Sequence, residues 1–163
     1  MLDDASFMQE ALKEAQAAFE AGEVPIGAVL VDAAGAIVAR AHNMRETWHD
    51  GTAHAEIIAL QQAAKALGRW RLAGLTLYVT IEPCPMCAGA LVMSRVDRVV
   101  YGAPDAKAGA CESLFNIVSH TALNHQLEMR AGVLEDECRA IMKRFFRERR
   151  RKRESAGDSP KQS

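Results

Sequence analysis

Two cysteines stand three residues apart in TIEPCPMCAG, residues 80–89 of a 163-residue chain that contains four cysteines. Cys84 and Cys87 could form a redox dithiol, supply half of a metal site, or be two small core residues. Thirty residues before Cys84, TAHAEIIAL places His54 and Glu56 two residues apart. One imidazole and two thiolates make three zinc ligands, whereas a structural zinc site has four. A catalytic zinc keeps the fourth position for a water whose pKa it lowers to about 7, and Glu56 is then free to move protons.

The joint pattern favours the catalytic interpretation over its rivals. A thioredoxin-like dithiol would have no use for His54 or Glu56. A non-catalytic zinc module that binds nucleic acid would need a fourth protein ligand and would leave Glu56 without a role. The order H-x-E…P-C-x-x-C is the signature of zinc-dependent nucleobase deaminases. It is matched by His54, Glu56, Pro83, Cys84 and Cys87.

The predicted secondary structure places both halves of this pattern at helix starts. Residues 53–67 are predicted to form a helix, with Thr52 as a candidate N-cap. His54 and Glu56 differ by about 200° around a helix, so they can share a site only in the first turn, where both reach past its end. Residues 85–93 are predicted to form a second helix, with proline in its first turn. Its cysteines lie one turn apart near the N-terminus, where free N–H groups favour thiolates.

The rest of the chain alternates between strands and helices, which indicates an α/β fold with a sheet covered on both faces. Helical spacing of apolar residues predicts a first helix over 7–19 and a last amphipathic helix from residue 134, with Cys138 and Phe145 on its apolar face. The predicted strands are 26–31, 36–41, 75–81, 96–101 and 127–129, and a further helix is predicted to begin in 112–118. The first two strands form an antiparallel hairpin, and the later ones are expected to be parallel.

The net charge of −1 hides an asymmetry, because residues 1–142 carry −7 and residues 143–163 carry +6. Eight basic residues fall in KRFFRERRRKR, 143–153. This segment is either a solvated helix end or a contact for a polyanion, and composition alone does not separate RNA, DNA and anionic lipid. We predict one domain over residues 1–153 and a disordered tail over 154–163.

Composition excludes several other classes of protein. Apolar residues make up 49% and charged residues 25% of the chain, which is typical of a globular domain. The acidic N-terminus is unlike a secretory signal, and no apolar run is long enough to cross a bilayer. We therefore expect a cytoplasmic protein with reduced thiols and no membrane partner.

The chain resembles the zinc-dependent cytidine/deoxycytidylate deaminase superfamily and, within it, the bacterial tRNA-specific adenosine deaminases. The likeness extends from about Phe7 to Arg150. Besides the zinc motif it depends on EVPIGAVLV (23–31), HN (42–43), VVYGAPDAKAGA (99–110), LNHQLE (123–128) and FFRERR (145–150). The segment 44–51 departs from the relatives, which carry prolines there.

This resemblance implies a three-layer α/β/α fold with a five-stranded mixed sheet, a homodimer, and one zinc ion per subunit held by His54, Cys84 and Cys87. It implies hydrolytic conversion of adenosine to inosine at the wobble position of an arginine tRNA anticodon, with Glu56 as the proton shuttle. Residues implied to bind the RNA are Asn43, Ala55, Asp105, Lys107, Phe145, Phe146 and Arg149. A rival that deaminates free bases or nucleotides would keep the zinc site and would not need the basic C-terminal helix.

Overall fold

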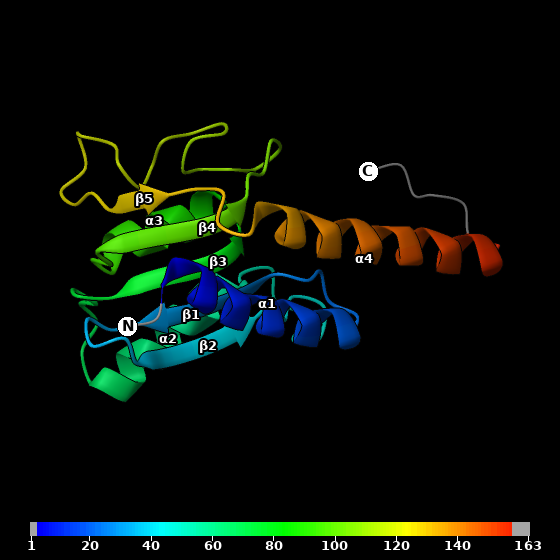
Figure 1. The fold of residues 1–163 in the computed structure, drawn as a ribbon, viewed down its shortest axis with the longest axis horizontal. Coiled ribbons are helices and arrows are strands. Elements are labelled where there is room, and N and C mark those ends of the chain that lie inside the picture. The colour runs from blue at the N-terminus through cyan, green and yellow to red at the C-terminus, as the bar shows by residue number, and fades with distance from the viewer. Residues whose placement is uncertain (1–2, 158–163) are drawn as a thin grey trace.

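The computed structural model describes residues 3–157 and shows a five-stranded sheet between helices (Figure 1). The elements are α1 (Asp4–Glu20), β1 (Gly27–Val31), β2 (Ile37–His42), α2 (Ala55–Leu67), β3 (Thr76–Ile81), α3 (Pro85–Met93), β4 (Arg98–Ala103), β5 (Glu128–Arg130) and α4 (Glu135–Ser155). Helix α4 thus continues into the first residues of the tail predicted over 154–163. The rest of that tail, from residue 158, lies outside the described residues.

The strands form one mixed sheet in the order β2-β1-β3-β4-β5, which confirms the five-stranded mixed sheet. β1 is antiparallel to both β2 and β3, while β3 and β4, and β4 and β5, are parallel. Gly27 at the start of β1 is paired with His42 at the end of β2. The residues before β1 therefore lie at the same end of the sheet as the residues that follow β2 and β3.

Helices cover the sheet on both faces, as predicted. Ala28, Leu30 and Leu77 face a cluster with α2 and α3. Val29 and Tyr78, next along the same strands, face a cluster with α1 and α4. Figure 1 shows α1 in front of the sheet, α2 and α3 behind it, and α4 running on beyond the sheet. Alternate side chains of the buried strands thus supply two separate cores, one on each face.

The start of α1 is fixed to three strands by one carboxylate. Asp4 accepts hydrogen bonds from Tyr78 Oη at 2.7 Å, from both Nη atoms of Arg98 at 2.9 and 2.8 Å, and from Arg130 Nη1 at 2.6 Å. The guanidinium of Arg98 is the chief reason that the pKa of Asp4 lies well below its usual value. This carboxylate joins α1 to β3, β4 and β5, so the helix has a fixed position on the sheet.

The helix predicted to begin within 112–118 is wrong, because this part of the chain is a series of turns in the long connection from β4 to β5. The N–H of Ile117 donates to the carbonyl of Ala110, seven residues earlier, whereas an α-helix joins residues four apart. The buried carboxylate of Glu82 accepts from the N–H groups of Cys111 and Ser113 at 3.1 and 3.0 Å. Backbone groups that a helix would pair internally are thus bound elsewhere.

Within residues 3–157 no helix has both the length and the apolar character needed to cross a lipid bilayer.

Candidate active site

The two helix starts predicted from the sequence meet at one end of the sheet. His54 is the N-cap of α2, and Cys84, which follows β3, is the N-cap of α3. α2 therefore begins at Ala55, two residues later than predicted, and Thr52 is not its cap, since its hydroxyl donates to Asp50 Oδ1. Neither N-cap side chain makes a capping hydrogen bond. The two side chains instead approach one another, with Cys84 Sγ 3.6 Å from His54 Nδ1.

The three predicted ligand side chains form one compact group. His54 Nδ1 lies 3.6 Å from Cys84 Sγ and 3.5 Å from Cys87 Sγ. The nitrogen and a sulfur bound to one tetrahedral zinc, at about 2.05 and 2.3 Å, would be about 3.6 Å apart. One imidazole nitrogen carries at most one hydrogen, so two nearly equal distances suit a shared ion better than two hydrogen bonds. The donor set and its spacing fit zinc.

Within residues 3–157 this candidate metal group consists of His54, Cys84 and Cys87, whose donor atoms all lie within 4.8 Å of one another. A tetrahedral ion bound by three side chains keeps a fourth position for water or substrate. The donor count therefore favours a catalytic centre over a structural one.

The electrostatics of the site favour a cation. A hydrogen bond from Cys87, together with one from His54, lowers the pKa of the Cys84 thiol to about 4. The same contact with Cys84, together with burial, raises the pKa of Cys87, while the bond with Cys84 raises that of His54. Burial raises the pKa of the Glu56 carboxyl, which suits a group that must both accept and release protons. A divalent cation displaces such ligand protons when it binds.

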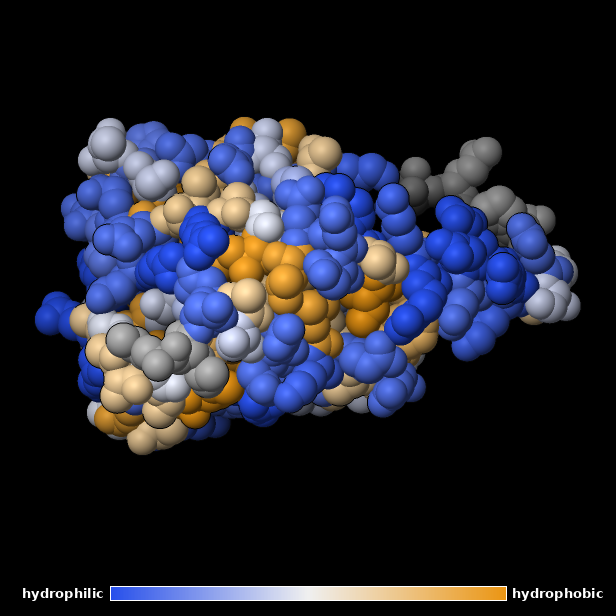
Figure 2. Space-filling view, in the orientation of Figure 1, coloured by the Kyte–Doolittle hydropathy of each residue, from blue (hydrophilic) through white to orange (hydrophobic). Residues whose placement is uncertain are grey.

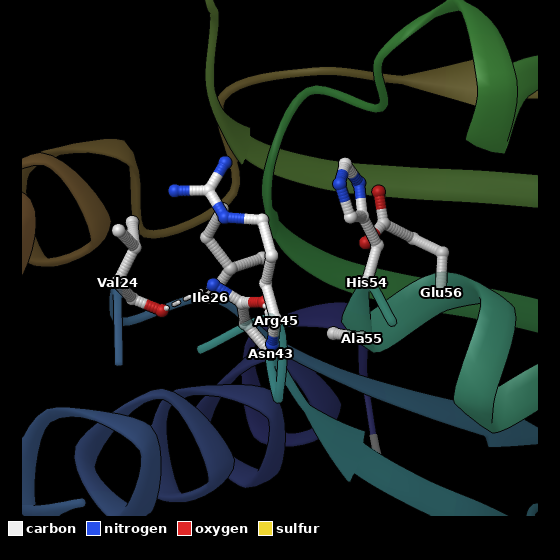
Figure 3. Close-up of a pocket in the computed structure, with 7 residues that line it drawn as sticks. All are labelled: Val24, Ile26, Asn43, Arg45, His54, Ala55 and Glu56. Atoms are coloured by element: carbon white, nitrogen blue, oxygen red, sulfur yellow. Dashed lines mark hydrogen bonds between the residues drawn. The ribbon is translucent and has the colours of Figure 1, made fainter. Parts of the chain in front are cut away.

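Beside this group lies a small pocket, shown in Figure 3. Its volume is ≈ 330 Å³ including its open mouth, at the small end of the range for ligand sites. It is lined by Val24, Ile26, Asn43, Arg45, His54, Ala55 and Glu56. Figure 3 shows His54 and Glu56 side by side at the start of α2, across from Val24 and Arg45. The buried Glu56 carboxylate therefore stands next to the metal ligands, in a space large enough for one planar ring.

Two of the predicted substrate residues, Asn43 and Ala55, line this pocket. The Asn43 amide donates from Nδ2 to the carbonyl of Val24 at 3.3 Å, and its Oδ1 accepts from the N–H of Arg45 at 3.0 Å. Asn43 thus joins the segment before β1 to the segment after β2. Both its carbonyl and its amide group are oriented by backbone.

The other predicted substrate residues lie outside the pocket lining. Asp105 accepts from the N–H groups of Lys107 and Ala108, so its carboxylate closes a turn of the β4–β5 connection. Phe145 and Arg149 line a second groove, between the end of α1 and α4. Phe145 is buried and packs edge-on against Phe19, as expected of a core residue, whereas Phe146 is exposed. The aromatic pair on α4 is therefore divided between core and surface.

Three of the pocket-lining residues and two buried acids were not predicted from the sequence. Val24 and Ile26 lie in EVPIG, a stretch used only for the resemblance, and Arg45 lies in a polar loop without a distinctive pattern. Glu23 and Glu82 are buried carboxylates. The signal that could have found Glu82 is its position directly after a continuous apolar strand, where a charged side chain needs partners.

A family model of MafB19-like deaminases matches residues 2–150. The chain belongs to this deaminase family. This deaminase is 56% identical over 156 residues, 96% of each chain, to a tRNA-specific adenosine deaminase of Bacillus subtilis (strain 168). The resemblance to the tRNA-specific adenosine deaminases is thereby confirmed, and with it an enzyme that catalyses deamination.

Two solved structures place this deaminase among its relatives. One, from a study of A-to-I editing by tRNA:A34 deaminases at the wobble position, matches with a TM-score of 0.80 and 46% identity over 83% of this chain and 98% of that chain. A guanine deaminase from Bacillus subtilis matches with a TM-score of 0.61 and 38% identity over 71% of this chain and 73% of that chain. The α/β/α deaminase fold is therefore shared with enzymes of different substrates.

Proposed function

We propose that this deaminase converts adenosine to inosine at the wobble position of a tRNA anticodon, with one zinc ion per subunit, and by family resemblance in an arginine tRNA. The observation that carries the proposal is the convergence of three metal donors beside a pocket that His54 and the buried Glu56 carboxylate line. The identity of 56% with a tRNA-specific adenosine deaminase supports the choice of substrate.

The residues of the site have distinct parts in this reaction. Held by His54, Cys84 and Cys87, a zinc ion would supply Lewis acidity that lowers the pKa of water to about 7. Glu56 takes a proton from the attacking water and delivers it to the ring nitrogen next to the amino-bearing carbon, while the water oxygen adds to that carbon. Glu56 then moves the remaining hydroxyl proton to the amino group, which leaves as ammonia. The ring carbon is left as the carbonyl of inosine.

The surroundings of the pocket suit a nucleoside within a single-stranded loop. An anticodon loop presents its bases outside a duplex, so the few kcal/mol needed to extrude a paired base are largely avoided. We assign Asn43 and Ala55 to the target nucleoside, because both line the pocket. Asp105 and Lys107 on one loop, and Phe146 and Arg149 on α4, would contact the flanking nucleotides by stacking and charge, while the buried Phe145 supports the ring of Phe146.

The main alternative is that the enzyme deaminates a free base. The similarity to a guanine deaminase is the observation that suggests this alternative. Such an enzyme would use the same metal group and pocket. The difference is α4, whose exposed arginines would have no role with a small neutral substrate. The basic helix therefore favours a polyanionic substrate.

We also propose a homodimer that acts in the cytoplasm, where tRNA is modified and thiol ligands stay reduced. Trp70, just after α2, and Met93, at the end of α3, are 59% and 69% exposed. Leu72 N bonds to the carbonyl of Ser94 at 2.8 Å, so the two segments lie close together. Large exposed apolar side chains on one face are typical of a protein interface. Sedimentation equilibrium at micromolar concentration should report twice the chain mass, and a monomer would contradict the dimer.

The decisive experiment incubates the purified protein with total tRNA and sequences the products for adenosine-to-inosine changes. We expect conversion confined to the wobble adenosine of an arginine tRNA. Activity on free guanine or adenine with none on tRNA would overturn the proposal in favour of the rival.

A further inference from the structure

The segment that closes the pocket on the side opposite His54 is held by a buried acid outside the reaction centre. Asn43 and Arg45 belong to the connection between β2 and α2 and line the pocket. Glu23, which is fully buried, accepts from Glu46 N at 3.0 Å and from Thr47 N at 2.7 Å. It also accepts from the hydroxyl of Thr47 at 2.6 Å. Three donors from two adjacent residues thus converge on one carboxylate.

Such an arrangement restrains the backbone on either side of the residues it binds. A buried carboxylate is costly unless its oxygens are hydrogen-bonded, so Glu23 and the segment 45–47 stabilise one another. Arg45 stands between this anchor and Asn43, whose Oδ1 binds its N–H. The backbone of Arg45 is consequently fixed from both directions, although its side chain lies in a surface loop.

The guanidinium of Arg45 is available to a ligand. Its side chain is 47% exposed, and its ion-pair contact is a distant one with the exposed Glu46, at 3.9 Å. Exposed pairs at this distance contribute little. Figure 3 shows the guanidinium above Asn43, on the Val24 side of the pocket and turned away from His54. A cation at the mouth of a pocket that holds one planar ring is placed for an anionic group attached to that ring.

We propose that Glu23 is a positioning residue for substrate binding, which holds the segment 45–47 so that Arg45 contacts a phosphate next to the reacting nucleoside. This inference rests on the proposed function, because a nucleotide within an RNA strand carries a phosphate next to the nucleoside, whereas a free base carries none. The guanidinium presents a fork of donors that matches phosphate oxygens. Arg45 thereby favours a nucleotide in RNA over a free base.

The test is a double-mutant cycle with Glu23→Gln and Arg45→Gln, using an anticodon stem-loop RNA with adenosine at the wobble position. Each single change should raise KM about tenfold, the loss expected for one charge-assisted contact, while kcat and zinc content stay near wild type. The double variant should resemble Arg45→Gln alone, since Glu23 acts through Arg45. Arg45→Gln should also lower the slope of log KM against log salt by about 0.7, one phosphate contact to a single strand.

The matched control is Glu20→Gln, the same change three residues away at an exposed position that accepts one bond from Gln16 at 3.4 Å. It should leave KM unchanged.

Two outcomes would contradict the positioning role. One is that the increases in KM caused by the two single changes multiply in the double variant. The other is that Glu23→Gln lowers stability without raising KM. If Glu23→Gln does not fold, Thr47→Val takes its place, because it removes only the hydroxyl donor and should raise KM about threefold without adding to Arg45→Gln. Wild-type protein inactive on the RNA would instead defeat the proposed function.

Discussion

The pocket and the distal part of α4, residues 147–155, differ in how their side chains are held. Around the pocket, His54, Cys87 and Glu56 are buried or half-buried and belong to helix starts fixed by the sheet. The distal part of α4 is largely exposed and runs beyond the sheet in Figure 1. Figure 2 shows hydrophilic residues over this end of the molecule, with apolar residues gathered in the middle of the same face.

The two regions therefore contribute different free energies: the pocket lowers the activation free energy of deamination, and distal α4 contributes to the free energy of RNA binding. Proton transfer requires atoms held within fractions of an ångström, which a buried and preorganised site supplies. Attraction of a polyanion depends on the number of charges and on salt, and tolerates mobile side chains. Substitutions in the pocket should therefore change turnover, whereas those in distal α4 should change affinity.

The largest effect is expected from Cys87→Ala. It leaves two of three ligands, so zinc content should fall from one ion per chain to nearly none, and inosine formation should fall below detection. Elemental analysis and a tRNA deamination assay measure both quantities. The matched control is Cys138→Ala. Cys138 lies on α4 and is as fully buried as Cys87, and its substitution should leave zinc content and activity unchanged. Full zinc content in Cys87→Ala would exclude it as a ligand.

Glu56→Ala should separate metal binding from proton transfer. We expect zinc to be retained while kcat falls about 10²–10⁴-fold, the usual worth of a general acid–base group. Single-turnover deamination of the stem-loop RNA measures the chemical step, and KM should change little. Loss of zinc from a folded Glu56→Ala protein would show that the carboxylate is a ligand and that its role is misassigned.

Neutralising distal α4 should act on affinity alone. Arg147→Gln with Arg150→Gln removes two exposed charges on the face that includes Phe146. The slope of log Kd against log salt for RNA binding should fall by about 1.4, and kcat at saturating RNA should not change. Lys13→Gln with Lys65→Gln, at exposed positions on α1 and α2, is the control. Equal losses in both pairs would mean that α4 has no specific part in binding.

Substitutions of the two phenylalanines of α4 test where the buried core ends and the RNA-binding surface begins. Phe145 is 7% exposed and packs against Phe19, so Phe145→Ala should lower the free energy of unfolding by about 3 kcal/mol. Phe146 is 41% exposed, and Phe146→Ala should instead weaken RNA binding by about 1–3 kcal/mol through a lost base stack. Urea titration and fluorescence anisotropy make the two measurements. Unchanged RNA affinity in Phe146→Ala would remove this residue from the substrate-binding set.

The metal-binding residues could be predicted from the sequence more accurately than the conformation of the loops. His54, Cys84 and Cys87 could be predicted to meet because ligand types and helix starts are local properties, and one buried sheet delivers both helices. The turns in 112–118 could not be predicted, because the backbone there bonds to Glu82, some thirty residues away. Arg45 was missed for a similar reason, since the residues that follow it bond to Glu23, which is distant in sequence. Contacts between remote segments leave no periodic signal.

The most direct test of the account is X-ray absorption at the zinc edge on the purified protein. We predict two sulfur ligands at about 2.3 Å and two lighter ligands at about 2.0–2.1 Å, one from His54 and one from water. A shell of three or four sulfurs would place another cysteine in the fourth position and contradict a catalytic centre. Full deaminase activity in protein free of metal would contradict the account altogether.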